Sequence, residues 1–380
     1  MSLKVTILGP AYPYRGGLAS IMETLACTFN KRGDAAEVLT FTVQYPSLLF
    51  PGKSQYRDGE PPQDVKITRC VSTVNPLNWI KVGQLIRREA PDLLVLKYWT
   101  PFMAPCFGTI ARIARGNGRT RVVCQIDNVV PHEHHWFDSM LTRYFVNSVD
   151  GFVYMSHDVG RTLAEFTRGQ KCVYSPHPIF ENFGQRIDRC EACNRLGLNP
   201  EVDYMLFFGL IRDYKGLDML LDAWAKLKAE GKTDGRRLIV AGEFYTDKRP
   251  YTEQIERLGL ADDILLHDWF VPDEQVPLYF SLTDALVLPY RTATQSGVTQ
   301  IAYNFDVPMI ATDVGGLGEI VIHERTGLVC EPSVDGIADA LSRFWRDELH
   351  APMVAAMPEE KKRFSWDKAV EALIESCQRR

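Results

Sequence analysis

Short apolar runs alternate with amphipathic helical patterns along almost the whole of this 380-residue chain. The first run, Val5 to Gly9, leads into a glycine-containing loop and then into a helix pattern at Leu18 to Arg32. Repeated alternation of this kind predicts parallel sheets that are covered by helices on both faces. Because 380 residues exceed what one ordinary core organises, two such domains are expected.

The break between the domains is predicted near Ser175 to Pro200, which is polar and rich in turn residues. The domains are then 1–178 and 200–364, and the final helical pattern, 365–380, is expected to pack back onto the first. Two doubly wound domains that face each other place a ligand in the cleft, at the carboxyl ends of their strands. Further strands are predicted at 37–42, 93–96, 122–126, 151–155 and 172–174, and in the second half at 205–208, 237–241, 264–267, 285–288 and 309–312.

Composition indicates a globular protein of a reducing compartment. The hydrophobic share is 46% and the charged share 24%, as in ordinary soluble domains. No apolar run reaches transmembrane length, and the first residues lack the architecture of a signal peptide. Cys190 and Cys193 have no second pair, which favours free thiols over a zinc site. We therefore expect a cytoplasmic protein.

The net charge of −5 is unevenly divided. Residues 1–177 carry 20 Lys and Arg against 14 Asp and Glu, whereas the remainder carries 23 against 34. A basic first half suits an anionic membrane surface or a phosphorylated acceptor, so peripheral contact with the inner membrane face is one expectation. Chance segregation of charge is the alternative, and no nucleic-acid partner is predicted.

The most informative segment runs from Phe207 to Asp218. A buried strand ends at Gly209, and a short loop with Arg212 and Lys215 leads into a helix pattern. A guanidinium, an ammonium and the backbone N–H groups of a helix start together suit a diphosphate. The alternative is a solvated loop with two surface cations.

Three glycine loops follow predicted strands: Gly16-Gly17, 294–298 and 314–319. Each can bring backbone N–H groups close to an anion at a helix start, or can be a plain tight turn. None is a Gly-x-Gly-x-x-Gly fingerprint and no Walker lysine follows, which disfavours a nicotinamide dehydrogenase.

Polar residues also follow the strand 122–126. Asp127, Asn128 and His132 can hydrogen-bond sugar hydroxyls or assist proton transfer. His132, His134 and His135 resemble metal ligands, but a loop does not fix their geometry, so no metal is predicted.

Taken together, these segments resemble the family 4 glycosyltransferases over essentially the whole chain. The resemblance implies the GT-B fold, with two Rossmann-like domains, and a retaining, metal-independent enzyme that needs no cofactor. It also implies transfer of a sugar from a UDP- or GDP-type nucleotide diphosphate sugar to a hydroxyl of a glycan, lipid-linked or small-molecule acceptor, in glycan, glycolipid or cell-envelope polysaccharide synthesis. The segments that carry it are Gly16-Gly17, 207–216, Val240 to Glu243, Pro289 to Gly297, Val307 to Thr312 and Gly315 to Glu319.

The resemblance also assigns roles to residues. It implies that Arg212 and Lys215 hold the diphosphate, while Asp127 and His132 position the sugar or the acceptor. The donor-binding set that it implies is Gly16, Gly17, Asn128, Glu243, Phe270, Val271, Gln295, Ser296, Gly297 and Val298, with Phe270 and Val271 beside the base.

The chain departs from the family pattern in two places. Two glutamates that many members carry are replaced by Ala293 and Ile301, and Asp127 stands where a histidine often ends the strand. Three alternatives therefore remain open: a nucleotide-sugar epimerase, a phosphorylase, and a non-catalytic sugar-nucleotide binding protein.

Two apolar stretches, Leu48 to Lys53 and Tyr98 to Phe107, bear on the acceptor. They are either a membrane-touching surface or ordinary core, and core is favoured because they lie within strand and helix patterns. The arginines that follow the second stretch are then a solvated basic face.

Overall fold

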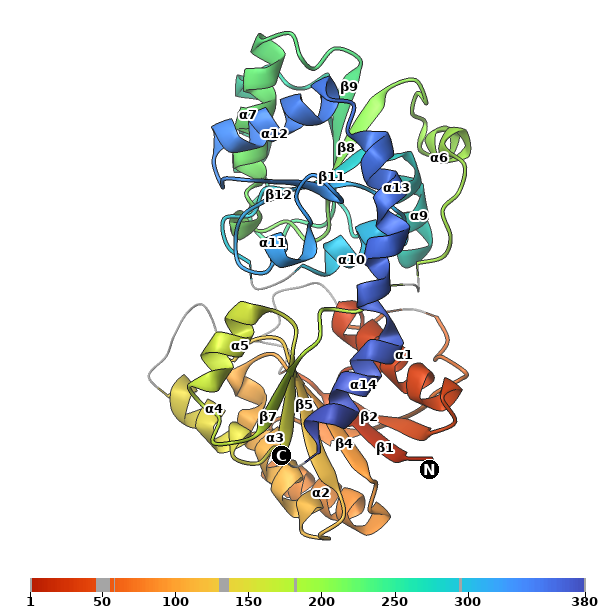
Figure 1. Cartoon of the computed structure of the whole chain (residues 1–380), viewed down its shortest axis with the longest axis vertical. Coiled ribbons are helices and arrows are strands. Elements are labelled where there is room, and N and C mark those ends of the chain that lie inside the picture. Colours follow the sequence, from red (N-terminus) through yellow and green to blue (C-terminus); the bar gives the residue numbers. More distant parts are fainter. Residues whose placement is uncertain are drawn as a thin grey trace. The chain divides into compact units, whose positions relative to one another are not determined.

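The chain folds into two compact units. In the computed structural model, the first unit joins Met1–His177 to Phe364–Arg380, and the second is Pro178–Arg363 (Figure 1). The segment 178–200, expected as the break, belongs to the second unit, where helix α6 (Arg189–Leu196) packs on α9 (Val276–Leu282). The structure describes residues 2–45, 55–57, 59–129, 137–180, 183–293 and 296–378.

Parallel pairing organises the first unit. Its described residues form a seven-stranded sheet with the order β3-β2-β1-β4-β5-β6-β7. The winding direction reverses between β1 and β4, and ligands of such sheets bind at the carboxyl edge beside this switch point. The strands are β1 (Lys4–Leu8), β2 (Ala35–Val43), β3 (Lys66–Ser72), β4 (Leu93–Tyr98), β5 (Arg121–Ile126), β6 (Gly151–Tyr154) and β7 (Lys171–Tyr174).

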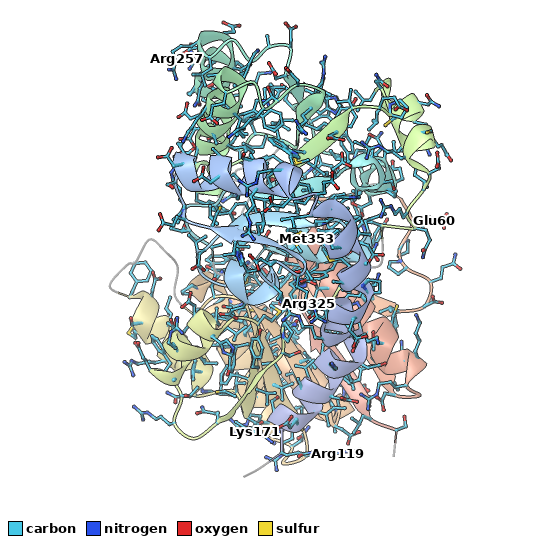
Figure 2. The ribbon with its side chains drawn as sticks, turned by 45° about the horizontal axis from the view of Figure 1, so that its top comes forward. Glu60, Arg119, Lys171, Arg257, Arg325 and Met353 are labelled. Atoms are coloured by element: carbon cyan, nitrogen blue, oxygen red, sulfur yellow. The ribbon has the colours of Figure 1, made fainter. Side chains whose placement is uncertain are left out.

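Helices cover both faces of this sheet, as right-handed crossovers require (Figure 1). Helix α3 packs against both α2 and α4, whereas α1 packs against α14. Helix α14 also contacts β5, β6 and β7, and Lys171 of β7, labelled in Figure 2, pairs with Glu375 of α14 at 3.0 Å. The helices are α1 (Gly17–Lys31), α2 (Pro76–Glu89), α3 (Ala104–Arg115), α4 (Asp138–Val146), α5 (His157–Ala164) and α14 (Trp366–Ser376).

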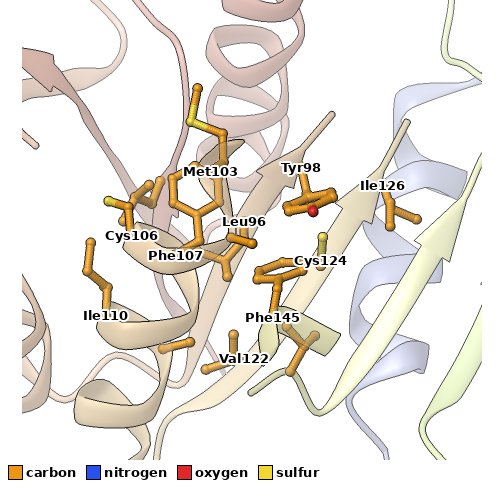
Figure 3. Close-up of a cluster of buried hydrophobic side chains, with 14 of the residues drawn as sticks. Leu96, Tyr98, Met103, Cys106, Phe107, Ile110, Val122, Cys124, Ile126 and Phe145 are labelled. Carbon is orange, nitrogen blue, oxygen red and sulfur yellow. The ribbon is translucent and has the colours of Figure 1, made fainter. Parts of the chain in front are cut away.

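Aromatic packing fills the core between the central strands and α3 and α4 (Figure 3). The Tyr98 ring stacks on Phe145 with centroids 4.2 Å apart, and Phe107 lies tilted against Phe145 at 6.4 Å. Met103, Cys106 and Phe107 are all wholly buried. The core interpretation of the stretch Tyr98 to Phe107 is therefore confirmed, whereas Leu48 to Lys53 lies outside the described residues.

In the second unit, the described strands are again all parallel, in the order β10-β9-β8-β11-β12-β13, so the switch point lies between β8 and β11. Its strands are β8 (Asp203–Phe208), β9 (Arg236–Ala241), β10 (Ile264–His267), β11 (Ala285–Leu288), β12 (Met309–Thr312) and β13 (Gly327–Cys330). Besides α6 and α9, its helices are α7 (Leu217–Ala229), α8 (Arg249–Arg257), α10 (Gly297–Asn304), α11 (Leu317–Ile320), α12 (Val334–Arg346) and α13 (His350–Glu360).

Every strand predicted from the sequence is present, and two strands, β3 and β13, were not predicted. Both lie at a sheet edge. Within the described ranges, no helix has both the length and the apolar character needed to cross a bilayer.

Candidate functional site

The loop after β8 places two cations at the carboxyl edge of the second sheet. Gly209 ends the strand, and a 3-10 turn over Asp213–Lys215 leads through Gly216 into α7. Gly216 has a φ of +68°, and a Cβ there would lie 2.0 Å from the carbonyl oxygen of Pro289. The loop therefore packs directly on the segment that follows β11, so Lys215 lies at the switch point between the two strands.

Lys215 is a buried cation for which the described residues supply no acidic partner. Its side chain is largely enclosed, with the residue 7% exposed, and no described carboxylate forms an ion pair with it. Burial, with a smaller contribution from the positive charge of Arg212, lowers the pKa of its ammonium to about 8. The Nζ atom lies 5.5 Å from the ring centroid of Tyr290, whose π face offers it a partial substitute for an anion.

Arg212 is exposed and lies over the ring of Tyr245, with 5.0 Å from Cζ to the centroid. None of the ion pairs among the described residues includes it. Its neighbour Arg291 differs, because both of its terminal nitrogens donate to Asp218, at 2.7 and 2.5 Å. Among the described residues, therefore, no carboxylate pairs with Arg212 or Lys215.

The start of α10 lies beside the same lysine. A Cβ built on Gly209 would be 3.4 Å from both Lys215 Nζ and Val298 Cγ2. Ser296 is the N-cap residue, and its hydroxyl lies 3.2 Å from the Tyr290 hydroxyl. Backbone N–H groups at the start of α10, which begins at Gly297, add a favourable field for an anion. The structure thus brings Lys215, Ser296, Gly297 and Val298 together.

Three further predicted residues belong to the same edge. The carbonyl of Glu243, after β9, accepts a hydrogen bond of 2.9 Å from Ile211 N, which ties Glu243 to the Arg212 loop. Phe270, after β10, is 40% exposed beside the equally open Trp269, whereas Val271 is buried. An exposed aromatic pair at the end of a strand offers a flat apolar surface on which a base can stack.

Gly16 and Gly17 lie at the matching edge of the first unit, in the loop between β1 and α1. Gly16 caps the helix with a φ of +99°, and no atom lies within 4 Å of the place where its Cβ would be. The preceding loop is braced by a salt bridge of 2.9 Å between Arg57 and Glu23, and Glu23 also accepts from Tyr12 N. Both glycines are exposed, with open space in front of the helix start.

Asp127 follows β5 and is held by a cation that the sequence did not suggest. Lys97 Nζ on β4 donates to Asp127 Oδ1 at 2.6 Å and lies 3.3 Å from Gln125 Oε1. Lys97 is wholly buried and Asp127 is 7% exposed. Asn128 is the next residue and is partly exposed. The only sign of this pair in the sequence was a lysine that interrupts the apolar run of β4.

Two predicted site residues, His132 and Gln295, lie outside the described residues, as do His134 and His135. In the parts of the chain that are described, no group of three or more His, Cys, Asp or Glu side chains has the proximity of a metal site. Tyr290 and Tyr245 are further members of the second-unit cluster that the sequence did not indicate, because an isolated tyrosine after a strand carries no local signal.

Comparisons with known proteins agree with this arrangement. The family model for glycosyl transferases group 1 matches residues 203–347. The lipopolysaccharide core biosynthesis mannosyltransferase LpsB of Rhizobium meliloti is 29% identical over 219 residues, 52% of this chain and 59% of that one. The GDP-mannose-dependent alpha-(1-6)-phosphatidylinositol monomannoside mannosyltransferase of Mycobacterium tuberculosis is 26% identical over 391 residues, 96% of this chain and 95% of that one. These similarities support the interpretation of the chain as a family 4 glycosyltransferase.

A solved structure of Anabaena HepE in complex with UDP and glucose is similar to this chain with a TM-score of 0.71, at 17% identity, over 98% of this chain and 99% of that one. At that identity the likeness concerns the fold alone. The predicted GT-B fold, with two Rossmann-like units, is confirmed. The match with LpsB spans less than two thirds of the length of that relative.

Proposed function

We propose that this protein is a retaining, metal-independent glycosyltransferase that takes a sugar from a nucleotide diphosphate sugar and acts in glycan or glycolipid synthesis. The observation that carries the proposal is the pair of cations, Arg212 and Lys215, that no described carboxylate neutralises. A buried charge without a partner is costly, and a bound diphosphate removes that cost. The similarity of the chain to known glycosyltransferases supports the same reaction.

In the proposed reaction, the bond between the anomeric carbon and the diphosphate oxygen breaks, and the electron pair leaves with the diphosphate. Arg212, Lys215 and the N–H groups at the start of α10 stabilise the charge that develops there. The acceptor oxygen then bonds to the anomeric carbon from the side of the leaving group, so the configuration is retained. The departing phosphate takes the proton of the acceptor hydroxyl, and no separate enzymic base is needed.

The donor is proposed to be a UDP- or GDP-sugar. The name of the Mycobacterium relative specifies GDP-mannose, and the Anabaena structure contains UDP. In this chain, Phe270 with the adjacent Trp269 would stack on the base, and Glu243 and Val271 would lie beside the nucleoside. Contacts with the phosphate, the sugar and the acceptor are proposed, as predicted from the sequence, for the remaining site residues: Gly16, Gly17, Asn128, Asp127 and His132.

Nucleotide binding should be measured first, because it requires no acceptor. UDP and GDP are titrated into the wild-type protein and into Lys215→Met, with Lys228→Met as the control because Lys228 pairs with Asp263 at an exposed site. We expect one nucleotide to bind, and Lys215→Met to weaken it while the control does not. Equal binding by all three proteins would contradict the proposed diphosphate site.

A panel of UDP- and GDP-sugars then tests turnover. Release of the nucleoside diphosphate, with NMR assignment of the product anomer, is expected to show transfer with retention. Binding without turnover of any donor would favour the non-catalytic sugar-nucleotide binding protein instead. Undiminished activity in excess EDTA is expected if Arg212 and Lys215 replace a metal, and a loss that Mg²⁺ or Mn²⁺ restores would contradict metal independence.

We also propose that the protein is cytoplasmic and acts at the inner face of a membrane. Leu77 and Ile80 of α2 are 71% and 42% exposed, and Met140 of α4 is 60% exposed. The exposed cations Lys81 and Arg88 lie on α2 among these apolar residues. Helices α2 and α4 both pack on α3, so they belong to one layer of the first unit. Exposed apolar residues interspersed with cations suit an anionic bilayer.

Co-sedimentation with vesicles of anionic and of neutral phospholipid tests this surface. Binding to anionic vesicles that decreases at high salt, and decreases further in Leu77→Gln/Ile80→Gln, is expected. No binding to anionic vesicles at low salt would contradict the membrane proposal without affecting the donor proposal.

A further inference from the structure

The carboxyl edge of the first sheet contains an ion pair at its switch point. Lys97 lies at the end of β4 and Asp127 follows β5, while the strand order places β4 between β1 and β5. The backbone N–H of Asp127 donates to the carbonyl of Tyr98 at 2.9 Å, which extends the pairing of β4 with β5 by one residue. The carboxylate thus lies at the position in the sheet where a ligand of such a domain binds.

The Lys97 side chain is clamped on several sides. A Cβ built on Gly9, at the end of β1, would lie 3.2 Å from Lys97 Cβ and 3.1 Å from Met22 Cγ, so β1 and α1 close over it. Its ammonium reaches Asp127 at 2.6 Å and Gln125 Oε1 at 3.3 Å. The Gln125 amide is itself held, because its Nε2 lies 3.4 Å from Met155 Sδ.

The two members of the pair differ in their access to solvent. Lys97 is wholly buried, whereas Asp127 retains 7% exposure, so a ligand can reach the carboxylate and not the ammonium. The hydrogen bond from this clamped donor fixes Oδ1 of the carboxylate and restricts rotation of the group. A carboxylate that is already neutralised by a cation attracts an uncharged hydroxyl rather than a second cation.

We propose that Lys97 is a positioning residue that holds the Asp127 carboxylate in the orientation in which it accepts a hydrogen bond from a hydroxyl of the sugar or of the acceptor. This inference rests on the proposed glycosyltransferase function. Lys97 acts only through Asp127 and contacts no substrate. Loss of its ammonium therefore affects the rate of transfer, while the diphosphate site on the second unit keeps its groups.

The test compares Lys97→Met, Asp127→Asn and the double variant with wild type. Lys66→Met serves as the control, because Lys66 is an exposed lysine of the same sheet that pairs with Glu37. For each protein, kcat and KM for donor and acceptor, Kd for the nucleoside diphosphate, and the urea unfolding midpoint are measured. Rates are taken well below the unfolding transition and divided by the folded fraction.

Lys97→Met is expected to lower kcat per folded molecule by about ten- to hundredfold, since small displacements of positioning groups have effects of that size. The nucleotide Kd should stay within about twofold of wild type, as it does in Lys66→Met. The double variant should be no slower than the slower single variant, because both substitutions remove the same placed carboxylate. The double variant also leaves no unpaired ion in the core. It therefore provides folded protein for the assay if Lys97→Met does not fold.

An unchanged kcat per folded molecule in Lys97→Met, with only a lower unfolding midpoint, would show that the pair is structural and would overturn the inference alone. If Lys97→Met does not fold, a double variant as fast as wild type overturns it in the same way. Absence of sugar transfer by the wild-type protein, with every donor, would overturn the proposed function and this inference together.

Discussion

Each of the two units buries a lysine at the switch point of its sheet, and the two lysines have opposite surroundings. Lys97 in the first unit is wholly buried and donates to Asp127 at 2.6 Å. Lys215 in the second unit is 7% exposed, and no described carboxylate pairs with it. The ring of Tyr290 lies 5.5 Å from its ammonium.

This difference separates a buried charge that a carboxylate neutralises from one that no described carboxylate neutralises. In a buried ion pair the two charges compensate each other within the protein, so the surrounding edge of the sheet is close to neutral. An unpaired buried ammonium lowers stability until an anion binds, so the same residue that weakens the free protein contributes to affinity. On this basis we propose that the second unit binds the phosphates and that the first binds uncharged hydroxyls.

The largest effect is expected for removal of the unpaired charge. Lys215→Met should lower kcat/KM by about two to three orders of magnitude, the cost of losing one preorganised group that stabilises developing charge. Its free energy of unfolding should stay equal to that of wild type or rise, because the buried charge is gone. Turnover assays and urea unfolding check both results, and Lys228→Met is the control. Wild-type turnover in a well-folded Lys215→Met would remove Lys215 from the site.

Where the buried charge is paired, removal of its partner is expected to lower the stability of the protein, in contrast to Lys215→Met. Asp127→Asn leaves the Lys97 ammonium buried without its carboxylate, and should lower the free energy of unfolding by about 3 kcal/mol. Asp263→Asn, which breaks an exposed pair with Lys228, should cost less than about 1 kcal/mol. Urea unfolding at pH 7 measures both. Equal small losses in the two variants would mean that water compensates Lys97.

A pH effect of intermediate size distinguishes the two lysines further. Burial lowers the pKa of Lys215 to about 8, so above this pH the free protein must take up a proton to bind a diphosphate. The Kd for the nucleoside diphosphate should therefore rise as the pH rises through 8, by up to about tenfold per pH unit. Calorimetric titrations of wild type and Lys215→Met between pH 7 and 9.5 test this, and a flat wild-type profile would contradict it.

The lowered pKa of Lys215 has the opposite effect on the stability of the ligand-free protein, which should rise with pH. Because the folded-state pKa lies below the unfolded value of 10.5, the burial cost is fully present below pH 8 and is relieved as the pH rises from 8 to 10.5. Lys215→Met should lack this rise in stability.

The smallest effect is expected for a cation that is already paired on the second unit. Arg291→Ala removes the two hydrogen bonds to Asp218, whose side chain is 39% exposed, and should cost less than about 1 kcal/mol of stability. Nucleotide affinity should change little, whereas Arg212→Ala should weaken it about tenfold. Titration of both variants decides the point. Equal losses would show that the pairing state of an arginine does not predict its role here.

The central strands of both sheets could be predicted from the sequence, but one edge strand of each sheet, β3 and β13, could not. β4 and β11 are buried on both faces, so each is an apolar run that stands out from its surroundings. β3 mixes polar with apolar residues, and only one of its seven residues is buried, while two of the four residues of β13 are only partly buried. Strands of this kind lack the continuous burial that makes a strand visible in a sequence.

The site residues likewise divide into those that could be predicted from the sequence and those that could not. Arg212 and Lys215 could be predicted because a loop between one strand and one helix keeps them together whatever the rest of the chain does. Tyr290 follows a strand 75 residues after Lys215 along the chain, and only the pairing of β8 with β11 brings it beside the lysine. Lys97 and Asp127 likewise meet through the pairing of β4 with β5.

The sequence by itself determined the two parallel-sheet units and the cations after β8, because both follow from local order and from the burial pattern of single strands. Only the tertiary structure decided which charges are satisfied within the protein. Lys97 interrupts an apolar strand and Lys215 follows one, and nothing in their neighbouring residues shows which of the two has a partner. The distinction depends on whether an adjacent strand brings a carboxylate within hydrogen-bonding distance, since the energy of a buried charge depends on the groups around it in space.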